Sequence, residues 1–227
     1  MNARTGALLE VTGCSYNDGM FVEGTLRWQV TEDCPWDLLI ALALRDLVGL
    51  DNTREPALPR VSPAVVPALH GASERSGPAA TLAAKDVLET QWHALFERAA
   101  DREHRPITPL LQPPHFAALD RAIELQDIVL AQHETAARWA RERRAEYARA
   151  SIEHHATRAA DIVDVVHERE HDLRRQAGYF RLDIDVLPLA ERGAWIVGPH
   201  TVVVSTSLRD DSQAFRDWFR PLVAALV

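Results

Sequence analysis

The longest stretch without glycine or proline runs from His115 to Ala177 and has the sequence HFAALDRAIELQDIVLAQHETAARWARERRAEYARASIEHHATRAADIVDVVHEREHDLRRQA. Its apolar residues recur at spacings of three and four, the period of one apolar face of a helix. A single helix of this length would be about 95 Å long. The stretch is therefore predicted to form either a coiled-coil-like arm or a hairpin of two helices that breaks near Arg149–Ser151. In both forms the apolar seam from Phe116 to Ala177 needs a partner.

The first fifty residues favour two strands followed by a helix. Residues 7–11 suit a strand, Asn17–Gly19 has turn composition, and residues 22–30 alternate between apolar and polar side chains. Pro35 stands at a typical first helical position, and the apolar residues between Trp36 and Val48 follow the helical period. We expect this helix to pack its apolar stripe on the dry face of the hairpin.

The next segments alternate between irregular and helical patterns. Residues 51–79 contain five prolines and little periodicity, which indicates a linker or an irregular wrap. A second helix is expected from about Ala79 to His104, where a group of prolines follows.

The C-terminal residues repeat the order seen at the N-terminus. Residues 180–186 alternate as a half-buried strand does, and residues 195–197 and 201–207 suit two more strands. Asp210–Ser212 can then cap a last amphipathic helix.

Together these patterns predict an α+β fold. Two terminal ββα units would form one antiparallel sheet, with a long helical segment, coiled-coil-like or a helical hairpin, inserted between them. The expected organisation is an N-terminal unit at 1–50, a Pro-rich linker at 51–78, a helical segment at 79–177, and a C-terminal unit at 178–227 that packs with residues 1–50.

Composition excludes several classes of protein. The net charge of -8 argues against a nucleic-acid binder, which needs a basic face. Cys14 and Cys34 are too few for a disulfide framework, which favours a reducing interior. Neither a signal peptide nor an apolar stretch long enough to span a membrane is evident. The expected location is cytoplasmic, with no membrane partner.

One short motif indicates a chemistry. Residues 167–171 spell HEREH, an instance of H-E-x-x-H, in which two histidines four apart hold zinc and the glutamate acts as a general base. The resemblance to zinc metalloproteases covers these five residues alone. It implies His167 and His171 as metal ligands and Glu168 as the catalytic base.

The context of this motif departs from the metalloprotease pattern. The two central positions are the charged Arg169 and Glu170, and helical geometry turns both histidines away from the apolar seam around Val166. A third ligand would have to come from outside any motif, the candidates being Asp183, Asp185, Glu191 and His200. A solvated helix face with charges of both signs is the simpler interpretation.

A di-iron carboxylate site is a further alternative. Asp164 and His167, like Glu168 and His171, are three residues apart, but such a site needs glutamates from two more helices, and only Glu89 and Glu124 could be named.

Two functions from different classes follow. The first is a non-catalytic protein–protein interaction or assembly protein that acts through its long helical segment, most simply as a homo-oligomer. The second is a zinc-dependent hydrolase that uses the motif at 167–171.

Overall fold

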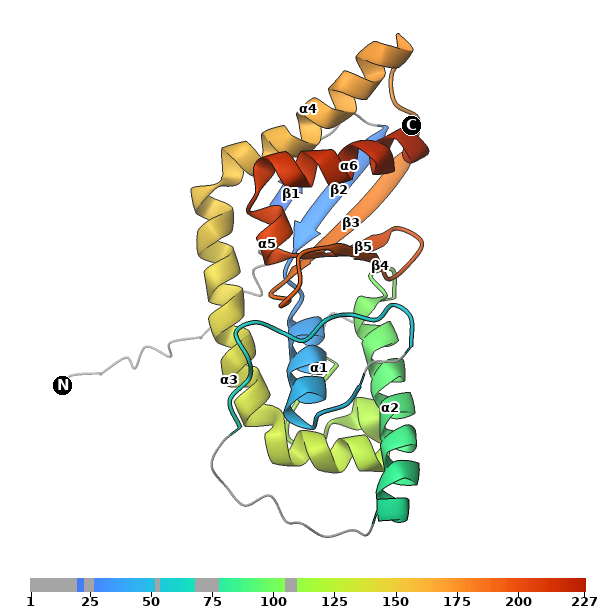
Figure 1. Ribbon diagram of the computed structural model, residues 1–227, viewed down its shortest axis with the longest axis vertical. Helices are drawn as coiled ribbons and strands as arrows, with labels where there is room; N and C mark the ends of the chain where they lie inside the picture. The colour runs from blue at the N-terminus through green and yellow to red at the C-terminus, as the bar shows by residue number, and fades with distance from the viewer. Residues whose placement is uncertain (1–19, 23–26, 52–53, 68–77, 105–109) are drawn as a thin grey trace, which may run out of the picture.

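The computed structural model describes residues 20–22, 27–51, 54–67, 78–104 and 110–227, and shows an α+β fold (Figure 1). A five-stranded sheet has the order β1-β2-β3-β5-β4. Its strands are β1 (Met20–Val22), β2 (Trp28–Asp33), β3 (Phe180–Leu187), β4 (Ala194–Ile196) and β5 (Thr201–Ser205). The two ends of the chain thus meet in one sheet, through the pairing of β2 with β3.

The prediction of an antiparallel sheet is wrong. The central pairs β2–β3 and β3–β5 are parallel, and only the edge strands β1 and β4 are antiparallel to their neighbours. Parallel neighbours need a long crossover, which the helical segment between Asp33 and Phe180 supplies. Alternation of apolar and polar residues carries no information about strand direction, so the sequence pattern could not show this.

The N-terminal hairpin also differs from its prediction. Val22 and Val30, placed by the alternation on one strand, are instead register partners in the two strands β1 and β2. The predicted strand at 7–11 and turn at 17–19 lie outside the described residues.

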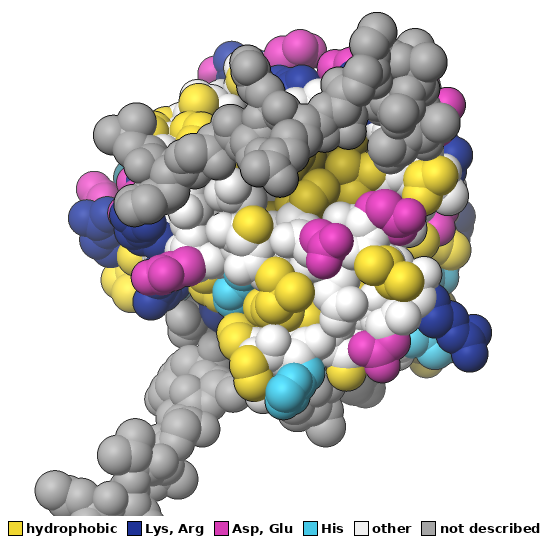
Figure 2. All heavy atoms as spheres, turned by 90° about the horizontal axis from the view of Figure 1, so that it is seen from below, with side chains coloured by type: hydrophobic (Ala, Val, Ile, Leu, Met, Phe, Trp, Pro, Cys, Tyr) yellow, Lys and Arg dark blue, Asp and Glu magenta, His cyan; other side chains and the backbone are white. Residues whose placement is uncertain are grey.

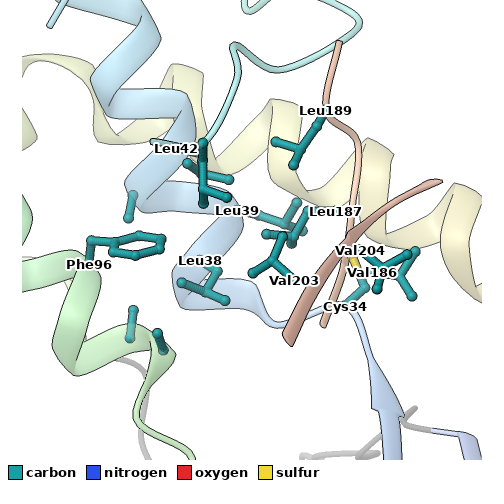
Figure 3. Packing of buried hydrophobic residues seen from close by; sticks show 14 of the residues in the cluster. Cys34, Leu38, Leu39, Leu42, Phe96, Val186, Leu187, Leu189, Val203 and Val204 are labelled. Carbon is teal, nitrogen blue, oxygen red and sulfur yellow. The ribbon is translucent and has the colours of Figure 1, made fainter. Parts of the chain in front are cut away.

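Helix α1 (Trp36–Leu47) is present as predicted, but it does not lie on a sheet face. It begins directly after β2 and continues away from the carboxyl ends of the parallel strands, between α2 and α3 (Figure 1). Figure 3 shows Leu38 and Leu39 of α1 beside Leu187 and Val203 of the sheet. Every residue from Asp37 to Arg45 is buried. A helix that is apolar around most of its circumference is buried on all sides.

The long segment forms two helices, α3 (Ile123–Glu153) and α4 (His155–Leu173), that meet at His154. They do not fold back on each other, so neither the single arm nor the hairpin is observed (Figure 1). The apolar side of α3 packs toward α1, and α4 lies beside α6 (Ser212–Leu226). The seam is therefore only partly covered within the chain. Leu119, Ala137 and Val166 are buried, whereas Ile123, Leu130 and Ile152 are exposed.

The remaining helices are α2 (Pro78–Ala100), the short turn η1 (Ala117–Leu119) and α5 (Thr206–Arg209). Helices α5 and α6 lie over one face of the sheet (Figure 1). Asp211 caps α6 as predicted, since its carboxylate accepts a hydrogen bond from the Ala214 N–H. Among the described helices, none combines the length and the apolar character that crossing a bilayer requires.

The Pro-rich segment, in its described part 54–67, is an irregular wrap fastened to the body. Arg45 donates hydrogen bonds to the carbonyls of Leu58 (2.7 Å) and Pro59 (2.6 Å). Trp139 of α3 donates to the Pro63 carbonyl (2.9 Å). Leu58 and Val61 are buried in the same hydrophobic cluster as the sheet and the helices.

Candidate functional site

The HEREH residues lie near the end of α4, where the helix extends past the sheet (Figure 1). His167, Glu168 and His171 are exposed, whereas Ile162, Val165 and Val166 on the opposite side are buried. The prediction that the motif faces away from the apolar seam is thus confirmed.

Glu168 is held by two arginines of the neighbouring helix α6. Its two carboxylate oxygens accept hydrogen bonds from Arg216 (2.9 Å) and Arg220 (3.2 Å). Arg216 also donates to Asp164 one turn earlier on α4 (3.0 Å). The hydrogen bond to Asp164 is the largest cause of the raised pKa of Arg216. These contacts direct the Glu168 carboxylate toward α6.

Two further charged residues at the end of α4, Glu170 and Arg175, have partners outside the helix. Glu170 accepts a hydrogen bond from the Ala177 N–H (2.7 Å), which fixes the turn that follows α4. Arg175 donates to the carbonyl of Val227 rather than to His171 (2.7 Å). These contacts hold the turn after α4 and join it to Val227.

The candidate third ligands lie away from the histidine pair or are engaged elsewhere. Asp183 and Asp185 are buried on β3, and Glu191 and His200 are exposed in the turns that flank β4. In the described part of the chain, no group of three or more His, Cys, Asp or Glu residues is arranged to hold a metal ion. The di-iron candidate Glu124 instead accepts a hydrogen bond from Gln91 of α2.

The sheet carries a polar cluster that the sequence reasoning missed. Thr31 of β2 donates a short hydrogen bond to Asp183, and Arg102, just after α2, forms an ion pair with Asp185. Arg102 also donates to Thr31 (3.1 Å), while Arg181 pairs with Asp183 (2.9 Å). Burial is the largest single effect and lowers the pKa of Arg102, but the charge and hydrogen bond of Asp185 and the charges of Asp33 and Asp183 together outweigh it, so the pKa is raised.

The prediction that β3 is half-buried, with its aspartates exposed to solvent, is therefore wrong. Asp183 and Asp185 are buried because a distant arginine supplies the opposite charge. The only signal in the sequence was the D-x-D alternation within an apolar strand, which does not identify Arg102, the partner of Asp185 that lies 83 residues earlier in the chain.

A second buried cluster lies on the other face of the sheet, around Glu32. The Glu32 carboxylate accepts hydrogen bonds from Arg209 of α5 (2.6 Å) and Arg158 of α4 (3.0 Å). Arg209 also pairs with Asp161 of α4 (3.2 Å). Tyr147 of α3 lies 3.4 Å from Glu32, and burial, followed by the charge of Glu32, raises the pKa of Tyr147. The cluster thus connects strand β2 with the helices α3, α4 and α5.

The carboxyl ends of the parallel strands are where open α/β sheets usually bind ligands. In this protein α1 fills that space, with Leu38 and Leu39 against Leu187 and Val203 (Figure 3). At the end of β5, the Ser205 hydroxyl accepts hydrogen bonds from the N–H groups of Gly193 and Leu208, which fastens the β3–β4 turn and caps α5. The packing of α1 and the hydrogen bonds of Ser205 thus both stabilise the fold.

Comparison with known proteins gives no relative: no protein-family model, curated protein sequence or solved structure matches the chain.

Proposed function

We propose that this protein is a non-catalytic assembly protein that self-associates through its helical segment. The proposal rests on one observation, an exposed apolar row on the outer side of α2 and α3. Val87 is 44% exposed, Ile123 64% and Leu130 59%, although their helices bury large apolar side chains on the inner side. We call these three residues the helical row.

The members of the helical row belong to one surface. Gln91 of α2 donates to Glu124 and accepts from the Leu125 N–H, so the two helices touch where α3 begins. Val87 lies one helical turn before Gln91, and Leu130 lies two turns after Ile123, so each pair shares a helix face. Figure 2 views the molecule from below, where hydrophobic side chains are interspersed with acidic ones.

Charge favours a second copy of this chain as the occupant. The exposed residues that flank the row on α3 are acidic: Glu124, Asp127 and Glu134. Further along the same helix, Arg138 and Arg141 are exposed and lie within about 80° of Leu130 around the helix axis, whereas the exposed Glu142 and Glu146 lie more than about 100° away. A second copy therefore presents charge complementary to the acidic surface, and complementary charges favour encounter and suppress wrong partners.

The proposal narrows the expected interface to part of the predicted seam. Contacts of α3 with α1 and of α4 with α6 cover much of the seam from Phe116 to Ala177. Its members Ile123 and Leu130 stay exposed, and self-association is expected from them together with Val87.

Light scattering coupled to size-exclusion chromatography, over a concentration series, tests the proposal. The wild-type chain should gain mass with concentration, and Leu130→Glu should remain monomeric. Ile196→Glu is the matched control, because Ile196 is 71% exposed but lies on the edge strand β4. A wild-type protein that stays monomeric throughout the series refutes the proposal, as does a Leu130→Glu variant that associates as the wild type does.

Charge reversal tests the choice of partner. Arg138→Glu with Arg141→Glu should weaken association, and mixing this variant with Asp127→Arg/Glu134→Arg should restore it. Association in the wild type should also weaken between about 0.05 and 1 M salt, because exposed charges are screened over a few ångströms at high ionic strength. If neither charge reversal nor added salt changes the association, the argument from charge complementarity is wrong.

A further inference from the structure

We propose that His167 and His171 form a two-histidine site for a divalent transition-metal ion such as Zn²⁺ or Cu²⁺ on the exposed side of α4, without hydrolytic activity. This inference is independent of self-association and goes beyond it. It rests on the placement of the two imidazoles and on the engagement of the glutamate between them.

The spacing suits a chelate. Both histidines lie within α4, which is continuous from His155 to Leu173, and both are exposed. Residues four apart on a helix are neighbours, with Cβ atoms about 5–6 Å apart. Two imidazole nitrogens at this spacing can reach one metal ion at about 2.0–2.1 Å each, as they do in H-E-x-x-H proteins. Water or a side chain from another molecule can fill the remaining coordination positions.

The ion pairs of Glu168 are the reason to expect metal binding at the two histidines without hydrolysis. A hydrolytic site needs that carboxylate free to take a proton from metal-bound water. Here both oxygens accept hydrogen bonds from Arg216 and Arg220, so the carboxylate is directed toward α6. The chelate then consists of two neutral nitrogen ligands. Imidazole nitrogen suits zinc and copper, whereas magnesium and calcium prefer oxygen.

Other histidines of the described chain lack this arrangement. His154 and His155 are both exposed at the junction of α3 and α4, but adjacent helical residues point about 100° apart. His104 contacts Asp101 at 2.9 Å, and His93 lies 3.3 Å from Glu97. His154 is accordingly the control position: exposed, close in sequence and without a histidine four residues away.

Isothermal titration of the full, untagged chain with Zn²⁺, and separately with Cu²⁺, tests the proposal. The wild type should bind one ion in its tightest phase. His167→Ala and His171→Ala should each weaken the metal affinity of that phase by about tenfold or more. In each variant a single imidazole binds the ion, without the second imidazole that the helix holds close by. His154→Ala and Glu168→Gln should leave the affinity unchanged, and far-UV circular dichroism should show every variant folded.

Copper spectroscopy identifies the ligands directly. Electron paramagnetic resonance of the Cu²⁺ complex should show coupling to two nitrogens in the wild type, which His171→Ala reduces to one. Equal affinity of the wild type and His171→Ala would mean an adventitious ion only and would overturn the site. A loss of binding in Glu168→Gln would show that the carboxylate contributes to metal binding and would overturn the assignment of two nitrogen ligands alone. Self-association by light scattering should be unchanged in His171→Ala, so this proposal and the previous one can fail separately.

Discussion

Replacing Glu32 by glutamine removes one buried charge from the cluster that joins β2, α3, α4 and α5. The side chain is fully buried, as is that of Arg209, and Arg158 is nearly so. The glutamine amide keeps one acceptor oxygen, but its NH₂ group must face one of the two arginines. The variant therefore loses a charge-assisted hydrogen bond and removes one of the negative charges that face the two buried guanidinium groups.

The expected cost follows from these contacts. Removing one partner of a buried ion pair costs about 3–5 kcal/mol. Arg209 retains Asp161, and Arg158 retains Asp210 at 2.7 Å, so the lower end of this range applies, about 3 kcal/mol. A domain is stable by about 5–15 kcal/mol in total, so the loss would be easy to measure.

Urea denaturation followed by circular dichroism measures this loss, with Glu168→Gln as the matched control. Glu168 also contacts two arginines, but on the surface, where its side chain is 49% exposed. Exposed pairs contribute about 0–1 kcal/mol, so the control should unfold near the wild-type midpoint. If Glu32→Gln costs no more than Glu168→Gln, the cluster does not hold these elements together and our account of it is wrong.

The other predictions concern the core, the wrap and the acid limit of stability. Leu44→Asp and Phe219→Asp should each abolish cooperative unfolding or cost several kcal/mol, because both positions are fully buried; unchanged melting of both would contradict the packing. Arg45→Met should speed tryptic cleavage after Arg60, since the wrap loses the hydrogen bonds to Leu58 and Pro59; unchanged digestion would show that the wrap is held by other contacts. Arg192 and the backbone N–H of Ala214 lower the pKa of Asp211 below its ordinary 3.8. The folded pKa therefore lies below the unfolded one, so this stabilisation is present above about pH 4 and is lost as the pH falls through the folded pKa. Asp211→Asn should flatten the acid limb of the stability curve, and an acid limb as steep as that of the wild type would exclude this contribution.

Local patterns in the sequence were sufficient to find most of the elements. The helical period from Trp36, the alternation from Phe180 and the cap at Asp211 depend on neighbours in the chain, and each is found where it was predicted. The outward orientation of His167 and His171 was also predictable, because the angle between residues of one helix is fixed by its geometry. Helix α4, by contrast, ends at Leu173, before the predicted end of the helical segment at Ala177.

The tertiary structure decided what local patterns do not encode. The direction of β3 relative to β2 depends on where the helical segment returns the chain, and the sequence constrains that path only through packing. The break at His154 has no glycine or proline to mark it, and Arg158, one turn into α4, is bonded there to Glu32 and Asp210. Asp183, Asp185 and Glu32 are charged residues of alternating strands, a pattern typical of solvent-exposed positions. They are nevertheless buried, and arginines far away in the chain neutralise Asp185 and Glu32. A buried charge needs an oppositely charged residue nearby in space, and that residue can come from anywhere in the chain. Local sequence therefore determined the helices and strands, whereas long-range contacts determined the order and direction of the strands and the burial of the charged residues.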